Sequence, residues 1–210
     1  ALPLGNGMLG AMVYGNVEKE ILKLNEHTLW SGGPFQNDVP ETLNALPEIR
    51  QLIFDGKHKE AENLANKVMF GKKSSGQIFQ PAGNLELIFP GQKEYKNYHR
   101  ELDLKKAIAK TSYRVDGVNY TRTAFAAFGN RIIVMRLTAN KPGQISFAAA
   151  YTTPHKKVSI QTSAVKDLMM EGISSDHEGV KGMVKYKVMS RFKNEGGTIT
   201  SSDSSITVKD

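Results

Sequence analysis

The sequence predicts a mainly β fold: a large antiparallel β-sandwich with one helical hairpin inserted near residues 41–70. From residue 78 onward, short β-prone runs are separated by turn signals, and no helical pattern intervenes. Helical periodicity is confined to a single stretch between residues 40 and 71. A doubly wound parallel sheet would need helices between most of its strands. An antiparallel sandwich of roughly ten strands therefore fits the pattern better.

The N-terminal region contains two short apolar runs, MLGAMVYG at residues 8–15 and EILKLN at residues 20–25. A polar stretch separates them, which is typical of two strands joined by a turn. We therefore expect a β-hairpin here. The following HTLWSGGPFQNDVP, residues 27–40, contains Gly-Gly-Pro and Asn-Asp and predicts a long loop.

The predicted helical hairpin rests on two groups of apolar residues at helical spacing. The first group is Leu46, Ile49, Leu52 and Ile53, and the second is Ala61, Leu64, Ala65 and Val68. Asp55-Gly56 separates the groups and Gly71 follows the second, and glycine at such positions ends helices.

Two later segments give the sharpest strand predictions. TSYRV and VNYTR flank Asp116-Gly117, the pair of residues that favours a two-residue hairpin turn. In VKYKVMSRF, residues 184–192, apolar and polar side chains alternate. Such alternation predicts a strand with one buried face and one face in water.

Composition narrows the classes of function. The formal charge is +7, from 28 Lys and Arg against 21 Asp and Glu, but the excess is spread along the chain. Short basic stretches without interleaved aromatics do not resemble a nucleic-acid surface, so we expect no nucleic-acid partner. No apolar run reaches the length of a membrane span, and we expect no membrane partner. The chain has no cysteine, which excludes disulfides and thiolate chemistry.

Residues 5–10, GNGMLG, match the spacing G-x-G-x-x-G of dinucleotide-binding domains. That motif requires a strand before the first glycine and a helix after the last, because the helix N-terminus holds the pyrophosphate. Here only ALPL precedes Gly5, and β-prone residues follow Gly10. We therefore interpret the match as accidental and expect no nucleotide or other cofactor.

Several blocks, in order and at matching separations, resemble the N-terminal domain of glycoside hydrolase family 95, the α-L-fucosidases, which is a family 65 N-terminal-like domain. The blocks are ALPLGNGMLGAMVYGNVEKEILKLNEHTLWSGGP (1–34), LPEIRQLIFDGKHKEAENLA (46–65), QPAGNLEL (80–87), YHRELDLKKAIAKTSYRVDGVNYTRTAFAA (98–127) and RIIVMRLTANKPGQISF (131–147). The resemblance is dense over about the first 150 residues and looser beyond them.

The resemblance implies a non-catalytic β-sandwich, residues 1–210, packed in the parent protein against a separate (α/α)6 barrel. In that family the barrel hydrolyses terminal α-linked L-fucose, or the similar L-galactose, with inversion; a Glu is the general acid, and an Asp with Asn residues activates water. No block here resembles the barrel, so no catalytic residue is carried over. We expect the chain to be a piece of this domain, cut at both ends. The resemblance further implies a fucosylated oligosaccharide as substrate and a periplasmic or secreted parent protein.

No group of side chains in the sequence stands out as catalytic or metal-binding. Glu18, Glu20 and Glu26 lie in the first matched block, with Glu18 and Glu20 expected on one strand face, and we interpret them as solvated acids. The five histidines, at positions 27, 58, 99, 155 and 177, lack the spacing of zinc ligands. We therefore expect no metal site.

The candidate substrate-binding or interdomain residues are Asn6, Asn25, Thr28 and Trp30. Trp30 is the only tryptophan and lies in a glycine-rich loop, where its ring could pack against another domain, contact a sugar, or fill the core. We favour interdomain packing. Asn6, Asn25 and Thr28 are polar and could face the same cleft, but hydrogen bonding within the loops is the simpler interpretation.

A second hypothesis is a stand-alone carbohydrate-binding sandwich. Such a module needs exposed aromatic rings, and one tryptophan is few for a sugar-binding platform. Tyr95, Tyr98 and Tyr113 could contribute to it.

Overall fold

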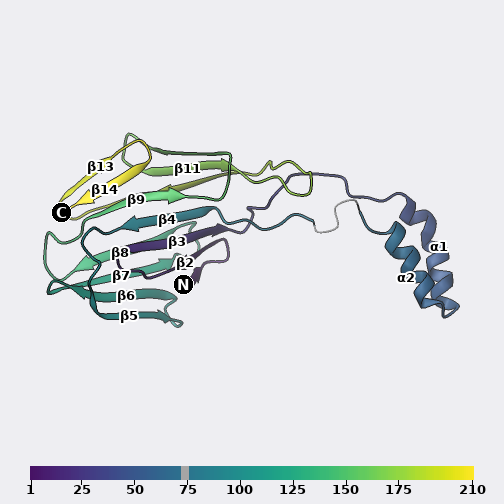
Figure 1. Cartoon of the computed structure of the whole chain (residues 1–210), viewed down its shortest axis with the longest axis horizontal. Helices are drawn as coiled ribbons and strands as arrows, with labels where there is room; N and C mark the ends of the chain where they lie inside the picture. Colours follow the sequence, from purple (N-terminus) through teal and green to yellow (C-terminus); the bar gives the residue numbers. More distant parts are fainter. Residues whose placement is uncertain (72–75) are drawn as a thin grey trace.

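The computed structural model describes residues 1–71 and 76–210, which form an antiparallel two-layer β-sandwich with a projecting pair of helices (Figure 1). One layer is a seven-stranded sheet in the order β1-β2-β3-β4-β9-β14-β13. Its strands are β1 (Leu2–Gly5), β2 (Leu9–Val13), β3 (Lys19–Glu26), β4 (Gly83–Ile88), β9 (Phe147–Thr152), β13 (Thr198–Ser201) and β14 (Ser205–Lys209). The predicted β-sandwich is confirmed, with more strands than expected.

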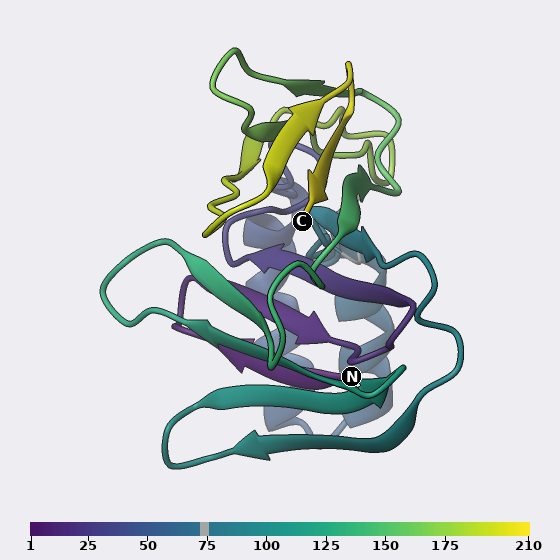
Figure 2. The ribbon, with the colours of Figure 1, turned by 90° about the vertical axis from the view of Figure 1, so that its left-hand side faces the viewer.

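Two smaller sheets make up the other layer. The four-stranded sheet contains β5 (Lys96–Asp103), β6 (Ile108–Val115), β7 (Val118–Ala126) and β8 (Ile133–Ala139). The three-stranded sheet contains β10 (Val158–Thr162), β11 (Leu168–Ile173) and β12 (Lys185–Ser190). In Figure 2, which looks from the end away from the helices, the dark teal strands β5 and β6 of the four-stranded sheet lie below the purple strands β1 to β3.

The hydrophobic core lies between these layers and consists mainly of aliphatic side chains that alternate along each strand. One cluster joins β4, β9 and β14 to the three-stranded sheet, with Leu168, Met170 and Ile206 fully buried. Another joins β1, β2 and β3 to β6 and β7 through Leu22, Ala109 and Ala124 among others. The long sheet thus holds both smaller sheets in place.

Local sequence explains several elements directly. Asp116 and Gly117 both have positive φ, 46° and 76°, as the two-residue turn between β6 and β7 requires. In β12 the predicted alternation is confirmed, although the residues on its inner face are half-buried and not fully buried. GNGMLG forms the antiparallel turn between β1 and β2, in which Gly5 pairs with Gly10, so a strand follows these glycines where a dinucleotide motif requires a helix.

The predicted helical hairpin is present as α1 (Glu41–Phe54) and α2 (His58–Val68). Gly56, at φ 73°, lies in the tight connection, and the hydroxyl of Thr42 donates to the carbonyl of Val68, 2.6 Å away, across the base of the hairpin. The pair stands away from the sandwich (Figure 1). No helix among the described residues is long and apolar enough to span a membrane.

Candidate functional site at the hairpin end of the sandwich

The four candidate substrate-binding or interdomain residues lie at one end of the sandwich, here called the hairpin end. It comprises the turn between β1 and β2, the loops at 27–40 and 76–82, and the connection between β11 and β12. β3 runs toward this end (Figure 1), and Asn25 is the next-to-last residue of β3. Asn25 pairs across the sheet with Gly10, which brings the turn containing Asn6 to the same end. The structure therefore gathers all four predicted residues in one region.

Trp30 lies on the surface of this end. Its side chain is 45% exposed, and its ring meets the ring of Phe79 edge-on, with centroids 5.8 Å apart. The indole N–H donates to the carbonyl oxygen of His27, 3.0 Å away. This geometry contradicts the interpretation of Trp30 as a plain core residue. The ring is fixed in orientation and still open to a partner.

Backbone pairing explains why these two rings point outward. The N–H of Ser31 donates to the carbonyl of Ile78, and the N–H of Gln80 donates to the carbonyl of Leu29, both at 2.9 Å. Leu29 is buried and anchors the strand-like segment, while the residue that follows it faces the opposite side.

Two glycines allow the loop after Trp30 to thread against the connection between β11 and β12. Gly32 has φ 65°, which favours glycine, and its N–H donates to the carbonyl of Ser175. Its own carbonyl accepts from the N–H of Met183, 2.9 Å away. At Gly182, a Cβ would lie 1.9 Å from the carbonyl oxygen of Ser174. The close backbone approach here therefore excludes larger residues.

A cluster of buried, hydrogen-bonded polar side chains lies on the interior side of this loop. His155 is buried, with Nε2 2.8 Å from the carbonyl of Pro81 and Nδ1 3.2 Å from the hydroxyl of Ser175. The side-chain oxygen of Gln80, also buried, accepts from the N–H of Ser175. Buried and mutually bonded polar groups hold one geometry, so the Trp30 loop is preorganised.

Thr28 and Glu26 form a small polar group beside Trp30. The hydroxyl and the N–H of Thr28 both donate to one carboxylate oxygen of Glu26, at 2.5 and 2.8 Å. Partial burial opposes ionisation of Glu26, but these hydrogen bonds and the nearby His27 and Arg131 lower its pKa below the ordinary value. Glu26 is therefore a structural anion near neutral pH, poorly suited to donate a proton as a general acid.

Asn6 is committed to the fold. Its amide nitrogen donates to the carbonyls of Ala127 and Asn130, at 2.9 and 2.7 Å, and its oxygen accepts from the N–H groups of Met8 and Leu9. The side chain thereby ties the β1–β2 turn to the β7–β8 turn. For Asn6, hydrogen bonding within the sandwich is what the structure shows. Asn25 is half-buried and pairs with Gly10 of β2.

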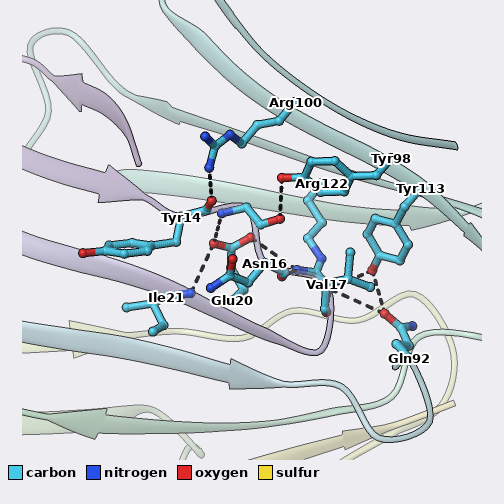
Figure 3. A network of polar contacts seen from close by, with 11 residues as sticks. Tyr14, Asn16, Val17, Glu20, Ile21, Gln92, Tyr98, Arg100, Tyr113 and Arg122 are labelled. Carbon is cyan, nitrogen blue, oxygen red and sulfur yellow. Dashed lines mark hydrogen bonds and ion pairs between the residues drawn. The ribbon is translucent and has the colours of Figure 1, made fainter. Parts of the chain in front are cut away.

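The expectation that Glu18 and Glu20 are solvated acids on one strand face is wrong for Glu20. Glu18 is exposed and precedes β3, with Lys93 Nζ 3.7 Å away. Glu20 is fully buried. Its carboxylate accepts from the N–H groups of Gly15 and Ile21, at 2.7 and 3.1 Å, as Figure 3 shows. The side chain turns inward because β3 alternates and Glu20 shares the core-facing side with Leu22.

The partner of Glu20 is Arg122 on β7, a residue that was not among those predicted from the sequence. One guanidinium nitrogen lies 3.2 Å from the Glu20 carboxylate and 2.6 Å from the carbonyl of Asn16. The other donates to the carbonyl of Val17 and to the hydroxyl of Tyr113, which itself donates to Gln92 (Figure 3). Burial raises the pKa of Glu20, while the amides and the guanidinium oppose that shift.

One signal in the sequence could have revealed this pair. In VNYTRTAF, Arg122 occupies the same alternating face as Val118, Tyr120 and Ala124, all of which are buried. An arginine on a core-facing position needs a buried acid or several carbonyls as partners. The network lies at the opposite end of β3 from Trp30 and stabilises the β2–β3 turn.

This geometry supplies a binding surface more readily than a reaction centre. Glu20 is engaged in the fold, Glu26 is held ionised, and Glu18 is in solvent. Within residues 1–71 and 76–210, no group of three or more His, Asp or Glu is placed to hold a metal ion. The rigid, exposed Trp30–Phe79 pair is the feature best suited to meet a partner.

Comparisons with known proteins agree with the resemblance found in the sequence. Residues 1–210 match the family model of the glycosyl hydrolase family 65 N-terminal domain. The chain is 35% identical over 175 residues to alpha-L-fucosidase 2 of Arabidopsis thaliana, covering 82% of this chain and 20% of that protein. It is 31% identical over 176 residues to a probable alpha-fucosidase A of Aspergillus niger, covering 79% of this chain and 21% of the relative. The chain thus spans about one fifth of the length of these relatives.

Proposed function

We propose, from the premise that this chain belongs to the family of glycosyl hydrolase family 65 N-terminal domains, that it is the non-catalytic β-sandwich of an α-L-fucosidase-like glycoside hydrolase. Its role is to brace the catalytic part of the parent protein. The preorganised aromatic pair of Trp30 and Phe79 at the hairpin end carries this proposal. A half-exposed tryptophan held by a buried polar scaffold is suited to packing against a second domain.

The parent protein would hydrolyse terminal α-linked L-fucose, or the similar L-galactose, on an oligosaccharide. The names of the relatives support a fucosidase, and the resemblance described above implies inversion of configuration by an (α/α)6 barrel. We place the parent in the periplasm or outside the cell, where such glycans occur. In this proposal the acid and base of the reaction belong to the barrel, because Glu20 and Glu26 serve the sandwich.

The direct test is fucose release from a 2′-fucosylated oligosaccharide, measured in parallel for residues 1–210 and for the full-length product of the gene. We expect release by the full-length protein and none by the isolated sandwich. Release by residues 1–210 would contradict the proposal and make Glu18, Glu20 and Glu26 the first positions to substitute. Lack of release by both would reject the fucosidase assignment.

A stand-alone carbohydrate-binding module remains the second candidate, and one observation favours it. Tyr95 and Tyr98 are both partly exposed on or beside the edge strand β5, with ring centroids 5.7 Å apart. Tyr113 is buried and cannot contact a sugar. Fluorescence titration of residues 1–210 with fucosylated and galactosylated glycans separates the two functions. Saturable binding that Tyr95→Ala abolishes would support the module, and a flat titration supports the brace.

A further inference from the structure

The helical hairpin exposes far more apolar surface than it buries. Within α1 and α2, only Ile49 and Ala61 are buried. Five large apolar side chains of the hairpin are instead in solvent: Leu43 (76% exposed), Ile53 (47%), Phe54 (82%), Met69 (44%) and Phe70 (64%). Single exposed apolar residues are ordinary, but a concentration of this kind marks an interaction surface.

The hairpin is also too small to be stable by itself. Its helices have 14 and 11 residues, lengths at which isolated helices are marginal in water. Most helical stability in proteins comes from packing an apolar face against other elements. Here the hairpin projects away from the sandwich, so the sandwich offers little of that packing (Figure 1).

The exposed apolar side chains continue from the hairpin to the sandwich. Phe35 lies on the segment leading to α1, and Ile78 and Phe79 lie on the segment returning from α2. Trp30 is edge-on to Phe79, so the apolar surface extends to the candidate site described above. Phe54 ends α1 at the distal tip, so exposed apolar side chains occur at the tip of the projection as well as at its base.

We propose that the hairpin is a docking arm that packs along the remainder of the parent polypeptide and is held in its orientation by that contact. This inference rests on the proposed function, because it assigns the catalytic part of the parent as the partner. The length of chain outside this domain supports that choice, since the relatives are about five times longer than the part matched. A partner within the same polypeptide also meets the arm at a high effective concentration.

Charge argues against nucleic acid, an anionic membrane or a second copy of the chain as the partner of the arm. Residues 41–70 carry four Lys or Arg against five Asp or Glu, so the arm does not attract nucleic acid or an anionic membrane. Two copies of the chain, each with a formal charge of +7, repel one another, which disfavours a second copy. An apolar surface on the same polypeptide fits the arm better.

The test measures backbone amide hydrogen exchange of residues 41–70 in two proteins: the isolated polypeptide of residues 1–210 and the full-length protein. We expect exchange in the full-length protein to be slower by at least about tenfold, because docking must open before these amides exchange. Equal exchange in the two proteins would overturn the inference. Protection that appears in residues 1–210 only at high protein concentration would assign the surface to a second copy instead.

A pair of variants of the full-length protein makes the test specific. Phe54→Ser, at the distal tip, is expected to move exchange of residues 41–70 toward that of the isolated chain. Val165→Ser is the matched control, because Val165 is 72% exposed and lies between β10 and β11, away from the hairpin end. An equal effect of both variants, or no effect of Phe54→Ser, would contradict docking of the tip. Fucose release is scored separately, so an inactive parent with a protected arm rejects the proposed function alone.

Discussion

Arg122 and Glu20 show how a single buried ion pair can fasten two layers. Arg122 lies on the four-stranded sheet, whereas the carbonyls of Asn16 and Val17 and the carboxylate of Glu20 belong to the turn and strand of the long sheet. The guanidinium also lies over the ring of Phe89, 3.9 Å from its centroid. Because each charge compensates the other, removing one partner leaves an uncompensated charge in the interior.

We expect Arg122→Met to lower the free energy of unfolding of residues 1–210 by about 3–5 kcal/mol. Methionine fills much of the volume but leaves the Glu20 carboxylate without its counter-charge. The matched control is Lys19→Met, which breaks the surface pair with Glu86 at 2.8 Å and should cost less than about 1 kcal/mol. Denaturant unfolding followed by Trp30 fluorescence measures both. Equal losses would mean that the buried pair contributes no more than a surface pair.

At the scale of elements, the loop carrying Trp30 is fixed by backbone geometry as much as by side chains. Gly32 exchanges hydrogen bonds with the β11–β12 connection in a conformation that favours glycine. A Cβ there would also lie 2.1 Å from the side-chain oxygen of Gln77, which bonds the hydroxyl of Ser31. The element is therefore sensitive to one methyl group.

Gly32→Ala is expected to destabilise the protein by about 1–2 kcal/mol more than Gly7→Ala. Both glycines have positive φ, 65° and 87°, but a Cβ at Gly7 would meet no atom within 4 Å. The difference between the two variants thus isolates the crowding at Gly32. Denaturant unfolding gives the energies, and acrylamide quenching of the single tryptophan reports whether the loop has loosened. Indistinguishable variants would show that Gln77 moves aside without cost.

At the scale of the whole molecule, exposed apolar surface is concentrated at the hairpin end and on the arm, while the Glu20–Arg122 network stabilises the opposite end. This asymmetry suits a domain that is firm at one end and meets a partner at the other. A protein that braces a second domain needs both properties. The stable end keeps the scaffold rigid, and the exposed apolar surface at the hairpin end becomes buried only in the parent protein.

Trp30→Ala separates a bracing role from a core role. In residues 1–210 we expect a loss of less than about 1.5 kcal/mol in unfolding free energy, because the ring is already 45% exposed. In the full-length protein the same change should reduce fucose release at least about threefold, through weaker packing against the catalytic part. Val165→Ala, at the other end, should change neither quantity. A large loss of unfolding free energy in residues 1–210, together with unaltered fucose release by the full-length protein, would show that Trp30 acts as a core residue.

Several secondary-structure elements were predictable because local sequence patterns determine them. Alternation in residues 184–192, the Asp116-Gly117 turn, and the two apolar groups of the helical hairpin are local patterns, and each produced the expected element. The family was recognisable from ordered blocks, and the match over residues 1–210 confirms it. These features depend on neighbours within a few residues, and so the sequence by itself determined them.

Only the tertiary structure decided what the polar and aromatic side chains do. Glu20 reads as a surface acid until Arg122, far along the chain, arrives beside it across the sandwich. From the sequence, interdomain packing was the favoured role of Trp30 but a core position stayed open, until the structure placed the ring against Phe79 and exposed it. Whether a side chain is buried depends on which strands pack against each other. That packing brings together residues that are far apart in the sequence. The physical reason is that desolvation and partner choice are properties of the packed layers, whereas strand and turn preferences belong to the local backbone.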